Sequence, residues 1–254
     1  MGLTRRQKTT TISLLLYWCG IFILTHISAV NVSYMILPKY LSDKTLHYLA
    51  YLLLVFLLWF AINPQKKVKW HQATVWWILF IVVWYGVFDE WLQGYVGRDP
   101  DVKDFYADMA GAFSSLVLLT IFSFGSAVLV VTGIFIFILT NLTKISIAHD
   151  LPKINALMIF FSYGFFAILW QRYMHHYIRP KSPQIKWLLI ALATPLGLLI
   201  TMQLFGLVFR GGFRYSDIII AATAIVGVVG TFYLTALFRK RISKKLLQKA
   251  NGIS

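Results

Sequence analysis

The sequence predicts an all-α protein, a polytopic bundle of about eight transmembrane helices, and its composition and patterning are the basis for that class. Hydrophobic residues make up 59% of the chain and charged residues 13%, whereas soluble domains carry roughly 25% charged residues. The mean hydropathy is +0.71. The apolar residues are gathered into long stretches, and about 20 of them in a helix cross a hydrocarbon core of roughly 30 Å.

The predicted spans follow one another through short connections. Several contain glycine, proline or one ionisable residue, which spanning helices tolerate when neighbouring helices satisfy those groups. The first stretch follows basic residues as a signal peptide does, but it is long enough to span and has no small-residue cleavage site after a short apolar core. We therefore expect it to be a helix. The spans are residues 11–30, 44–62, 73–92, 105–123, 126–142, 154–174, 186–207 and 216–238.

The charged residues predict the orientation of these spans. With the N-terminus inside, about two thirds of the 24 Lys and Arg residues fall in inner segments, as the positive-inside rule requires. All nine Asp and Glu residues then fall at the outer face. We expect both termini in the cytoplasm and the protein in the plasma (inner) membrane. Cys19, the only cysteine, lies within the first span, so the chain forms no internal disulfide.

The net charge of +15 is explained by basic residues that lie next to the membrane surface. The basic run from Arg239 to Lys249 follows the last span, where anionic lipid head groups attract Lys and Arg. The other basic residues are spread over several loops, which argues against nucleic acid as a partner and leaves membrane lipids as the expected one. The oligomeric state is not predicted.

The two halves of the chain resemble each other, which indicates a parallel repeat of two four-helix units. We expect a unit at 1–124 that carries a polar motif and a degenerate unit at 125–254; chance similarity of hydropathy is the alternative. The matching pairs are Lys44 with Lys153, Gln93 with Gln203, Arg98 with Arg210, and Asp104 with Asp217. The second unit has Ala156, Ala221 and Ala224 where the first has His47, Asp108 and Gly111.

The second span begins with two candidate site residues, Asp43 and His47, which lie four residues apart and so share a helix face. Asp43 is also placed to be the N-cap of this helix, and capping alone would explain it. It would not explain His47, one turn deeper, where an imidazole needs a partner. His26, near the end of the first span, is a further candidate neighbour.

The third span ends with Asp89, Glu90 and Gln93, and the spacing lets Gln93 face either carboxylate. Adjacent carboxylates at a helix C-terminus need a cation, because that end of the helix dipole is already negative. Arg98, in the following turn, is one candidate for it. Its guanidinium suits either a carboxylate or phosphate ligand or an internal salt bridge, and the sequence leaves both open.

The fourth span begins at Asp104, a second candidate N-cap, with Asp108 one turn further on. Asp108 is too deep to cap the helix, so we expect it to face the interior of the bundle. Gly111 would let a neighbouring helix approach closely. One imidazole with several carboxylates suits a divalent ion, but the spacing matches no metal motif, and no metal or cofactor is predicted.

In order, the chain carries D-K-x-x-H-x-x-x-Y from Asp43, D-E-x-x-Q from Asp89, G-R at Gly97 and D-x-x-x-D-x-x-G-A from Asp104. This pattern resembles the VanZ-like family of bacterial membrane proteins over residues of about 40–124. The family is named for a protein accessory to teicoplanin resistance at the outer face of the membrane. The resemblance implies an outward-facing site near cell-wall precursors or lipid-linked groups. The motif residues would be His47, Glu90, Gln93, Arg98, Asp104 and Asp108.

Four functions remain open on these observations. The first is an outward-facing polar pocket that binds a cell-wall precursor, a lipid head group or a glycopeptide antibiotic. The second is an enzyme that uses Glu90 or Asp108 with His47 as an acid–base pair on a lipid-linked substrate. The third, a transporter or flippase, is disfavoured because the inner half of every span is almost purely apolar. The fourth is a structural or partner-binding role, in which the polar cluster only packs helices together.

Overall fold

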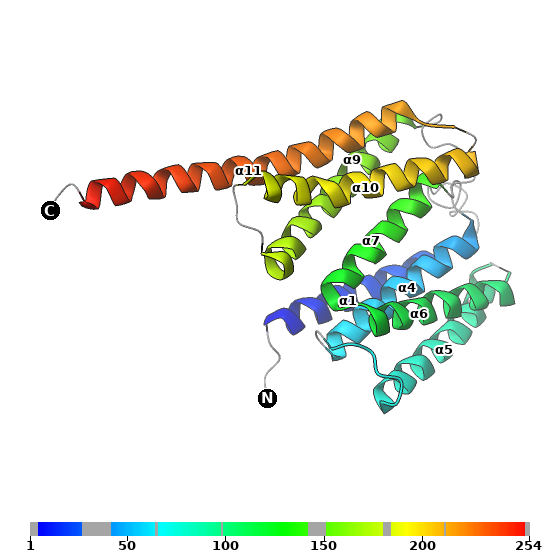
Figure 1. Cartoon of the computed structure of the whole chain (residues 1–254). Coiled ribbons are helices and arrows are strands. Elements are labelled where there is room, and N and C mark those ends of the chain that lie inside the picture. Colours follow the sequence, from blue (N-terminus) through cyan, green and yellow to red (C-terminus); the bar gives the residue numbers. More distant parts are fainter. Residues whose placement is uncertain are drawn as a thin grey trace. The chain divides into compact units, whose positions relative to one another are not determined.

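The computed structural model describes residues 5–26, 42–63, 66–97, 99–141, 151–179, 184–210 and 212–251, and these residues form helices and connections without a strand (Figure 1). The predicted all-α class is confirmed. The helices are α1 (Arg5–Thr25), α4 (Asp43–Ile62), α5 (Ala73–Gln93), η1 (Gly94–Val96), α6 (Val102–Ile121), α7 (Phe124–Asn141), α9 (Pro152–Tyr173), η2 (Met174–Ile178), α10 (Ile185–Arg210) and α11 (Tyr215–Asn251).

Seven of the described helices, all except α1 and the short η1 and η2, are long and apolar enough to cross a membrane. The protein is therefore a multi-pass membrane protein. The predicted first span, 11–30, falls largely on α1, which begins with the polar run from Arg5 to Thr11 and is not among the seven. The end of that predicted span, residues 27–30, lies outside the described residues.

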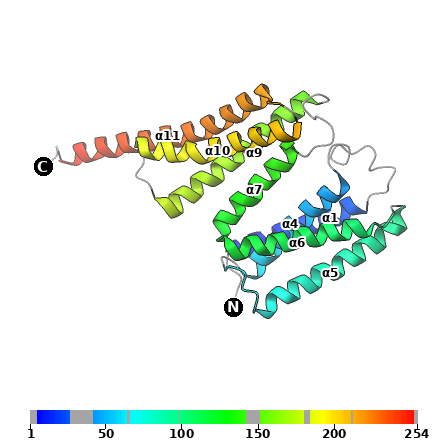
Figure 2. The same cartoon turned by 45° about the vertical axis from the view of Figure 1, so that its right-hand side comes forward.

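The chain divides into two compact units, and the division falls between Val131 and Thr132, inside α7. In unit 1, the part before this point, α4 and α6 share the most extensive interface, α1 packs on α4, and α5 packs on α6 (Figures 1 and 2). Gly111 of α6 makes the central contact of unit 1 possible. A Cβ added there would overlap the carbonyl oxygen of Tyr48 and lie 2.9 Å from the backbone nitrogen of Leu52, both in α4.

The two helices that carry most of the polar residues begin at caps that differ from the predicted ones. Ser42 caps α4 by accepting a hydrogen bond from the Thr45 N–H, and Asp101 caps α6 by accepting one from the Lys103 N–H. The prediction that Asp43 and Asp104 are N-caps is wrong. Both carboxylates lie in the first turn, where the positive end of the helix dipole still favours them.

At the opposite end of unit 1, the connection between α4 and α5 is held against the end of α6. The Val68 N–H donates to the Leu119 carbonyl at 3.0 Å, and the Trp70 Nε1–H donates to the Thr120 hydroxyl at 3.0 Å. Lys67 Nζ donates to the Ile121 carbonyl at 2.8 Å. A cation at this position satisfies an orphan carbonyl and complements the negative end of the helix dipole.

In unit 2, the part from Thr132 onward, α9 and α11 share the most extensive interface, and α10 packs against both. Gly164 of α9 lies close to Ala224 and Val228 of α11, so a small residue again sits where two helices meet. The last helix continues to Asn251, well past the apolar part that ends at Phe238, before the basic run that starts with Arg239. The basic tail is therefore helical up to Asn251.

Candidate functional site

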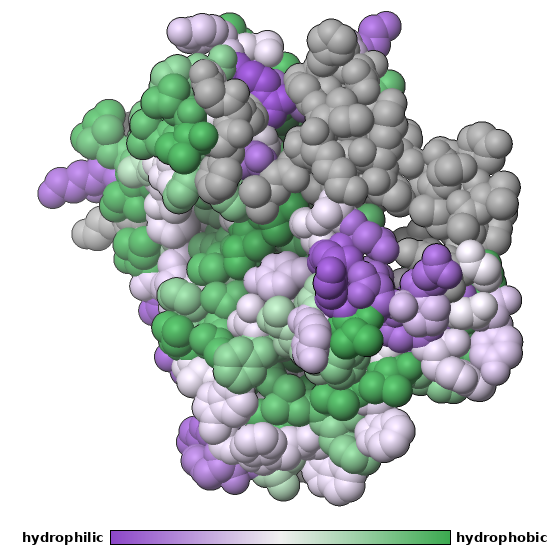
Figure 3. Space-filling model, turned by 90° about the vertical axis from the view of Figure 1, so that its right-hand side faces the viewer, coloured by the Kyte–Doolittle hydropathy of each residue, from purple (hydrophilic) through white to green (hydrophobic). Residues whose placement is uncertain are grey.

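The buried acidic side chains of unit 1 meet at one end of its helices, together with His47 and Lys44. They come from the C-terminal ends of α1 and α5 and from the N-terminal ends of α4 and α6. Figure 3 views the side on which the α5–α6 connection lies in Figure 1, and hydrophilic side chains gather on that face beside hydrophobic surface. Four stretches of chain far apart in the sequence thus contribute to one polar cluster.

A histidine–aspartate pair lies at the centre of the cluster. His47 Nδ1 of α4 and Asp108 Oδ1 of α6 are hydrogen-bonded at 3.0 Å. His47 is 5% exposed and Asp108 is fully buried. The second oxygen of Asp108, Oδ2, has no hydrogen-bond partner among the described residues, and neither has the hydroxyl of the buried Tyr51 one turn from His47. The pair is therefore buried, and Asp108 Oδ2 remains free to accept a further hydrogen bond or to bind a cation.

Glu90 of α5 extends the pair into a group of three. One carboxylate oxygen, Oε2, accepts a hydrogen bond from the Asp101 N–H at 3.0 Å, and the other, Oε1, is buried and without a hydrogen-bond partner among the described residues. His47, Glu90 and Asp108 each place a nitrogen or oxygen within 4.8 Å of the other two. All three side chains are buried, so one small volume holds two carboxylates and an imidazole.

Asp89, the neighbour of Glu90, is fully buried and is satisfied by other residues. Its Oδ2 accepts a hydrogen bond from Gln93 Nε2 at 3.0 Å, and its Oδ1 accepts one from the Thr25 hydroxyl at 3.0 Å. His26 Nδ1 lies 3.8 Å from the same Oδ1. Gln93 therefore faces Asp89 and leaves Glu90 to the His47–Asp108 pair.

Lys44 forms the outer rim of the cluster. Its Nζ lies 2.9 Å from Asp101 Oδ2 and 3.0 Å from Asp104 Oδ1, so one ammonium ties the α5–α6 connection to the first turn of α6. The hydrogen bond from Lys44, together with that from the Lys103 N–H, holds the pKa of the exposed Asp101 below its usual value. This ion pair reaches solvent, so we assign it little stabilising energy.

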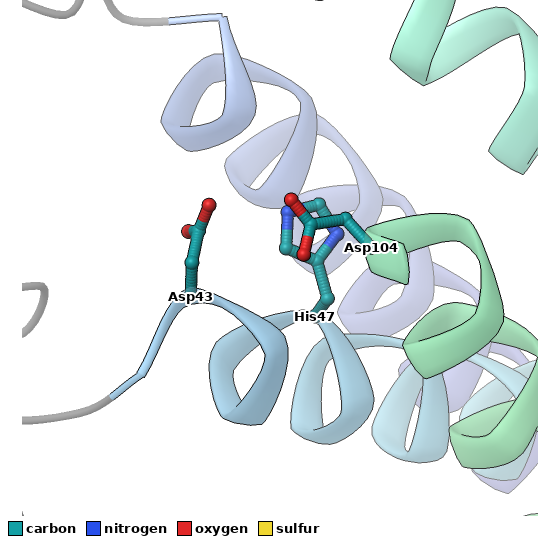
Figure 4. A group of neighbouring side chains, drawn as sticks. All are labelled: Asp43, His47 and Asp104. Carbon is teal, nitrogen blue, oxygen red and sulfur yellow. The ribbon is translucent and has the colours of Figure 1, made fainter. Parts of the chain in front are cut away.

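A second group of three shares His47 with the first. Figure 4 shows Asp43 and His47 one turn apart on α4, with Asp104 approaching from α6, and their ligand atoms also lie within 4.8 Å of one another. This outer group differs in its surroundings. Asp43 is exposed and has a further interaction of its own, and Asp104 is paired with Lys44.

Among the described residues, the charges of the cluster do not balance locally. Asp89, Glu90, Asp104 and Asp108 are all at most 8% exposed, and Lys44 reaches only Asp104 among them. A charged Asp at the centre of a spanning helix costs roughly 2.5–3.5 kcal/mol, and such groups normally pair with one another or line a functional path. In the part of the chain that the structure describes, the other three carboxylates share the charge of His47 and, at 3.8 Å, of His26.

Sequence reasoning placed some of these residues and missed others. The cluster includes the candidates Asp43, His47, Glu90, Gln93, Asp104 and Asp108, with Gly111 one turn below Asp108. The sequence does not mark Lys44, Asp101 or Thr25 as site residues, because the side-chain contacts that bring them into the cluster join positions 57 to 64 residues apart. Arg98 lies outside the described residues, directly after Gly97, whose φ of 75° marks a left-handed turn.

The corresponding end of unit 2 has less polar chemistry. Asp217 of α11 is 1% exposed, accepts a hydrogen bond from Asn155 Nδ2 at 3.0 Å, and lies 3.0 Å from Arg214 Nε. Its partners are thus an amide and a cation. A pocket of about 810 Å³ in the described part of the chain lies elsewhere in unit 2, between η2 and α11 near Arg239. The unit 1 cluster lines neither this pocket nor a smaller one in unit 2 beside Asn155.

Comparison with known proteins adds no identification. No family model matches the chain, and neither does a curated protein or a solved structure.

Proposed function

We propose that the chain is a VanZ-like bacterial plasma-membrane protein whose unit 1 cluster recognises a polar group at the outer face of the membrane. The ligand classes are the head group of a cell-wall precursor or other lipid, or a glycopeptide antibiotic. The observation that carries the proposal is the buried group of His47, Glu90 and Asp108, in which two carboxylate oxygens have no hydrogen-bond partner among the described residues. Buried polar groups that the protein leaves unsatisfied are typical of binding sites.

The orientation and the internal repeat belong to the same proposal. The proposal counts α1 as an eighth span beside the seven longer apolar helices, so that both termini lie in the cytoplasm. The cluster then faces outward, because the loops on the opposite side carry most of the Lys and Arg residues. Unit 2 is a degenerate copy of unit 1 that supports it. In favour of a common plan, the most extensive interface in unit 1 joins α4 and α6, and in unit 2 it joins α9 and α11, which occupy the corresponding positions in the sequence.

A second candidate, a membrane enzyme acting on a lipid-linked substrate, is favoured by the contact between His47 and Asp108. With Asp108 ionised, its carboxylate accepts the Nδ1 proton of His47 and fixes the ring. The Nε2 atom is then the one that can accept a substrate proton. Glu90 would supply the second titratable group, because its ligand atom lies within 4.8 Å of those of the pair.

The proposed function is tested by antibiotic susceptibility. The full chain is expressed in a teicoplanin-sensitive bacterium, and the inhibitory concentrations of teicoplanin and of a membrane-active control antibiotic are measured. We expect the wild type to raise the teicoplanin value at least fourfold, and His47→Ala and Asp108→Asn to remove this effect. Asp99→Asn, which changes an exposed acid outside the cluster, is the matched control.

Equal amounts of each variant in the membrane fraction are required for the comparison. If His47→Ala and Asp108→Asn are as abundant as the wild type and protect equally well, the cluster is not the functional site. If all variants and the wild type leave susceptibility unchanged, glycopeptides are removed as the ligand class. Extracted lipid-linked cell-wall precursors, quantified by mass spectrometry with and without the protein, then decide between binding and turnover, because only an enzyme changes their chemical form.

A further inference from the structure

We propose that His47, Glu90 and Asp108 form a binding site for a divalent transition-metal ion such as Mn²⁺ or Zn²⁺. The inference deepens the proposed function, since it concerns the same cluster, and it rests on that function only for the use to which the ion is put. Nothing in the local spacing of the sequence indicates such a site, because the three ligands come from α4, α5 and α6.

The ligand set has the right chemistry for such an ion. One imidazole and two carboxylates are donors for ions of intermediate character, such as Zn²⁺ and Mn²⁺, rather than the thiolate set of a structural zinc site. All three side chains are buried, so the ion would be shielded from bulk water by α4, α5 and α6. Binding through His47 Nδ1 would displace the proton that this atom shares with Asp108.

The distances fit without rearrangement of the helices. Two neighbouring ligands about 2.1 Å from one ion lie about 3.0 Å apart in the octahedral geometry typical of Mn²⁺ and about 3.4 Å apart in the tetrahedral geometry typical of Zn²⁺. His47 Nδ1 and Asp108 Oδ1 are separated by 3.0 Å. The ligand atom of Glu90 lies within 4.8 Å of theirs, so a small side-chain movement would complete the set.

An independent observation points to a ligand inside the group. Glu90 Oε1 and Asp108 Oδ2 are buried oxygens without a hydrogen-bond partner among the described residues, on side chains that are 8% and 0% exposed. Leaving a carboxylate oxygen unsatisfied in an apolar interior is costly. A divalent cation would supply both oxygens with a partner and offset the negative charge that Lys44, held by Asp101 and Asp104, does not reach.

An ion would also reconcile the acidic cluster with the proposed ligands. The head groups of lipid-linked wall precursors and of anionic lipids carry phosphate, which buried carboxylates repel. A metal ion bound by three protein ligands keeps coordination positions open, and a phosphate oxygen can occupy one of them. The cation would thus convert a site that excludes phosphate into one that binds it.

The test is metal binding by the full chain purified in detergent and stripped with a chelator. Mn²⁺ alone is titrated, and free Mn²⁺ is followed by electron paramagnetic resonance. We expect one ion per chain, with an affinity that falls at least tenfold in Glu90→Gln and in Asp108→Asn. These variants keep the shape of the side chain and remove its charge. Asp99→Asn and Asp217→Asn are the controls, one exposed and one buried in unit 2, and we expect both to bind as the wild type does.

Melting temperatures distinguish a variant that has lost the metal site from one that binds poorly because it is misfolded. Mn²⁺ or Zn²⁺ should raise the melting temperature of the wild type, since a ligand that binds only the folded state stabilises it, and should not raise that of Glu90→Gln. A folded wild type that binds neither ion at 1 mM overturns the proposal. So does binding that survives Glu90→Gln but is lost in Asp43→Asn, because the outer group of Figure 4 would then hold the ion.

The two proposals fail separately in these experiments. If Mn²⁺ binds as expected while susceptibility and precursor levels never change, the metal site stands and the proposed function fails. If the protein protects cells but binds no ion, the proposed function stands and the metal site fails.

Discussion

Gly111→Ala is the most direct test of how the cluster is assembled. The added Cβ would overlap the Tyr48 carbonyl oxygen and lie 2.9 Å from the Leu52 nitrogen. Both are backbone atoms of α4, so no change of rotamer relieves the contact and the two helices have to move apart. Overpacking of this kind costs about 1–3 kcal/mol, and the better helix propensity of alanine recovers at most about 1 kcal/mol of it.

The expected result is a lower melting temperature. At about 2–4 °C per kcal/mol for a chain of this size class, we expect Gly111→Ala to melt several degrees below the wild type. The nine tryptophans make intrinsic fluorescence during a thermal ramp in detergent a suitable assay. Ion affinity should fall as well, because Asp108 lies one turn from Gly111 and His47 is next to Tyr48, so separating the helices separates the pair.

Two other glycines of unit 1 provide a graded control. A Cβ on Gly20 of α1 meets nothing within 4 Å, so Gly20→Ala should melt at or above the wild-type temperature. A Cβ on Gly86 of α5 would lie 3.2 Å from the Phe105 ring, a side chain that can shift, so Gly86→Ala should fall between the two. A Gly111→Ala protein that melts with or above Gly20→Ala would refute the close contact of α4 and α6.

Three further predictions concern the packing, the second unit and the orientation. Trp59→Phe removes the 2.8 Å hydrogen bond from Nε1 to the Lys66 carbonyl and should cost about 0.5–1.5 kcal/mol, seen as a lower melting temperature; an unchanged one would show that water replaces the indole. Asp217→Asn removes the partner of Arg214 and should lower the melting temperature without changing Mn²⁺ affinity, and a parallel loss of affinity would contradict separate sites. In a Cys19→Ser background, Asp99→Cys should react with an impermeant maleimide on intact cells and Lys69→Cys only after permeabilisation; the opposite pattern would reverse the orientation.

The helices themselves were well predicted from hydropathy. The predicted span 44–62 is α4, Asp43–Ile62, and 73–92 is α5, Ala73–Gln93, with the ends shifted by one residue. The predicted last span, 216–238, lies within α11, which runs on to Asn251 as a helix beyond the apolar residues. Hydropathy marks only the part of a helix that is apolar, whereas the Lys, Arg, Leu and Gln residues that follow are good helix formers.

The sequence predicts the contacts of the site only where they depend on spacing along one helix. Spacing along the helix allowed Gln93 to face either Asp89 or Glu90. Only the tertiary structure determines that its side chain donates a hydrogen bond to Asp89. The N-caps were misassigned for a similar reason, because Ser42 and Asp43 are adjacent and both suit the position. The contact of Thr25 with Asp89 spans 64 residues and has no periodic signal.

The two units together argue that the unit 1 cluster is more than helix packing. In unit 2, the buried Asp217 has an amide, Asn155, and a cation, Arg214, each 3.0 Å away, and this is how a structural carboxylate is ordinarily accommodated. In unit 1, Asp104, which the proposed repeat pairs with Asp217, has its own cation, Lys44, at 3.0 Å. The deeper Glu90 and Asp108 keep oxygens that no described residue satisfies. The two units differ in charge compensation, because Asp217 Oδ2 also has no hydrogen-bond partner among the described residues but lies 3.0 Å from the Arg214 guanidinium. Glu90 and Asp108 share the single imidazole of His47 among the described residues, and the proposed cation would offset the negative charge that remains.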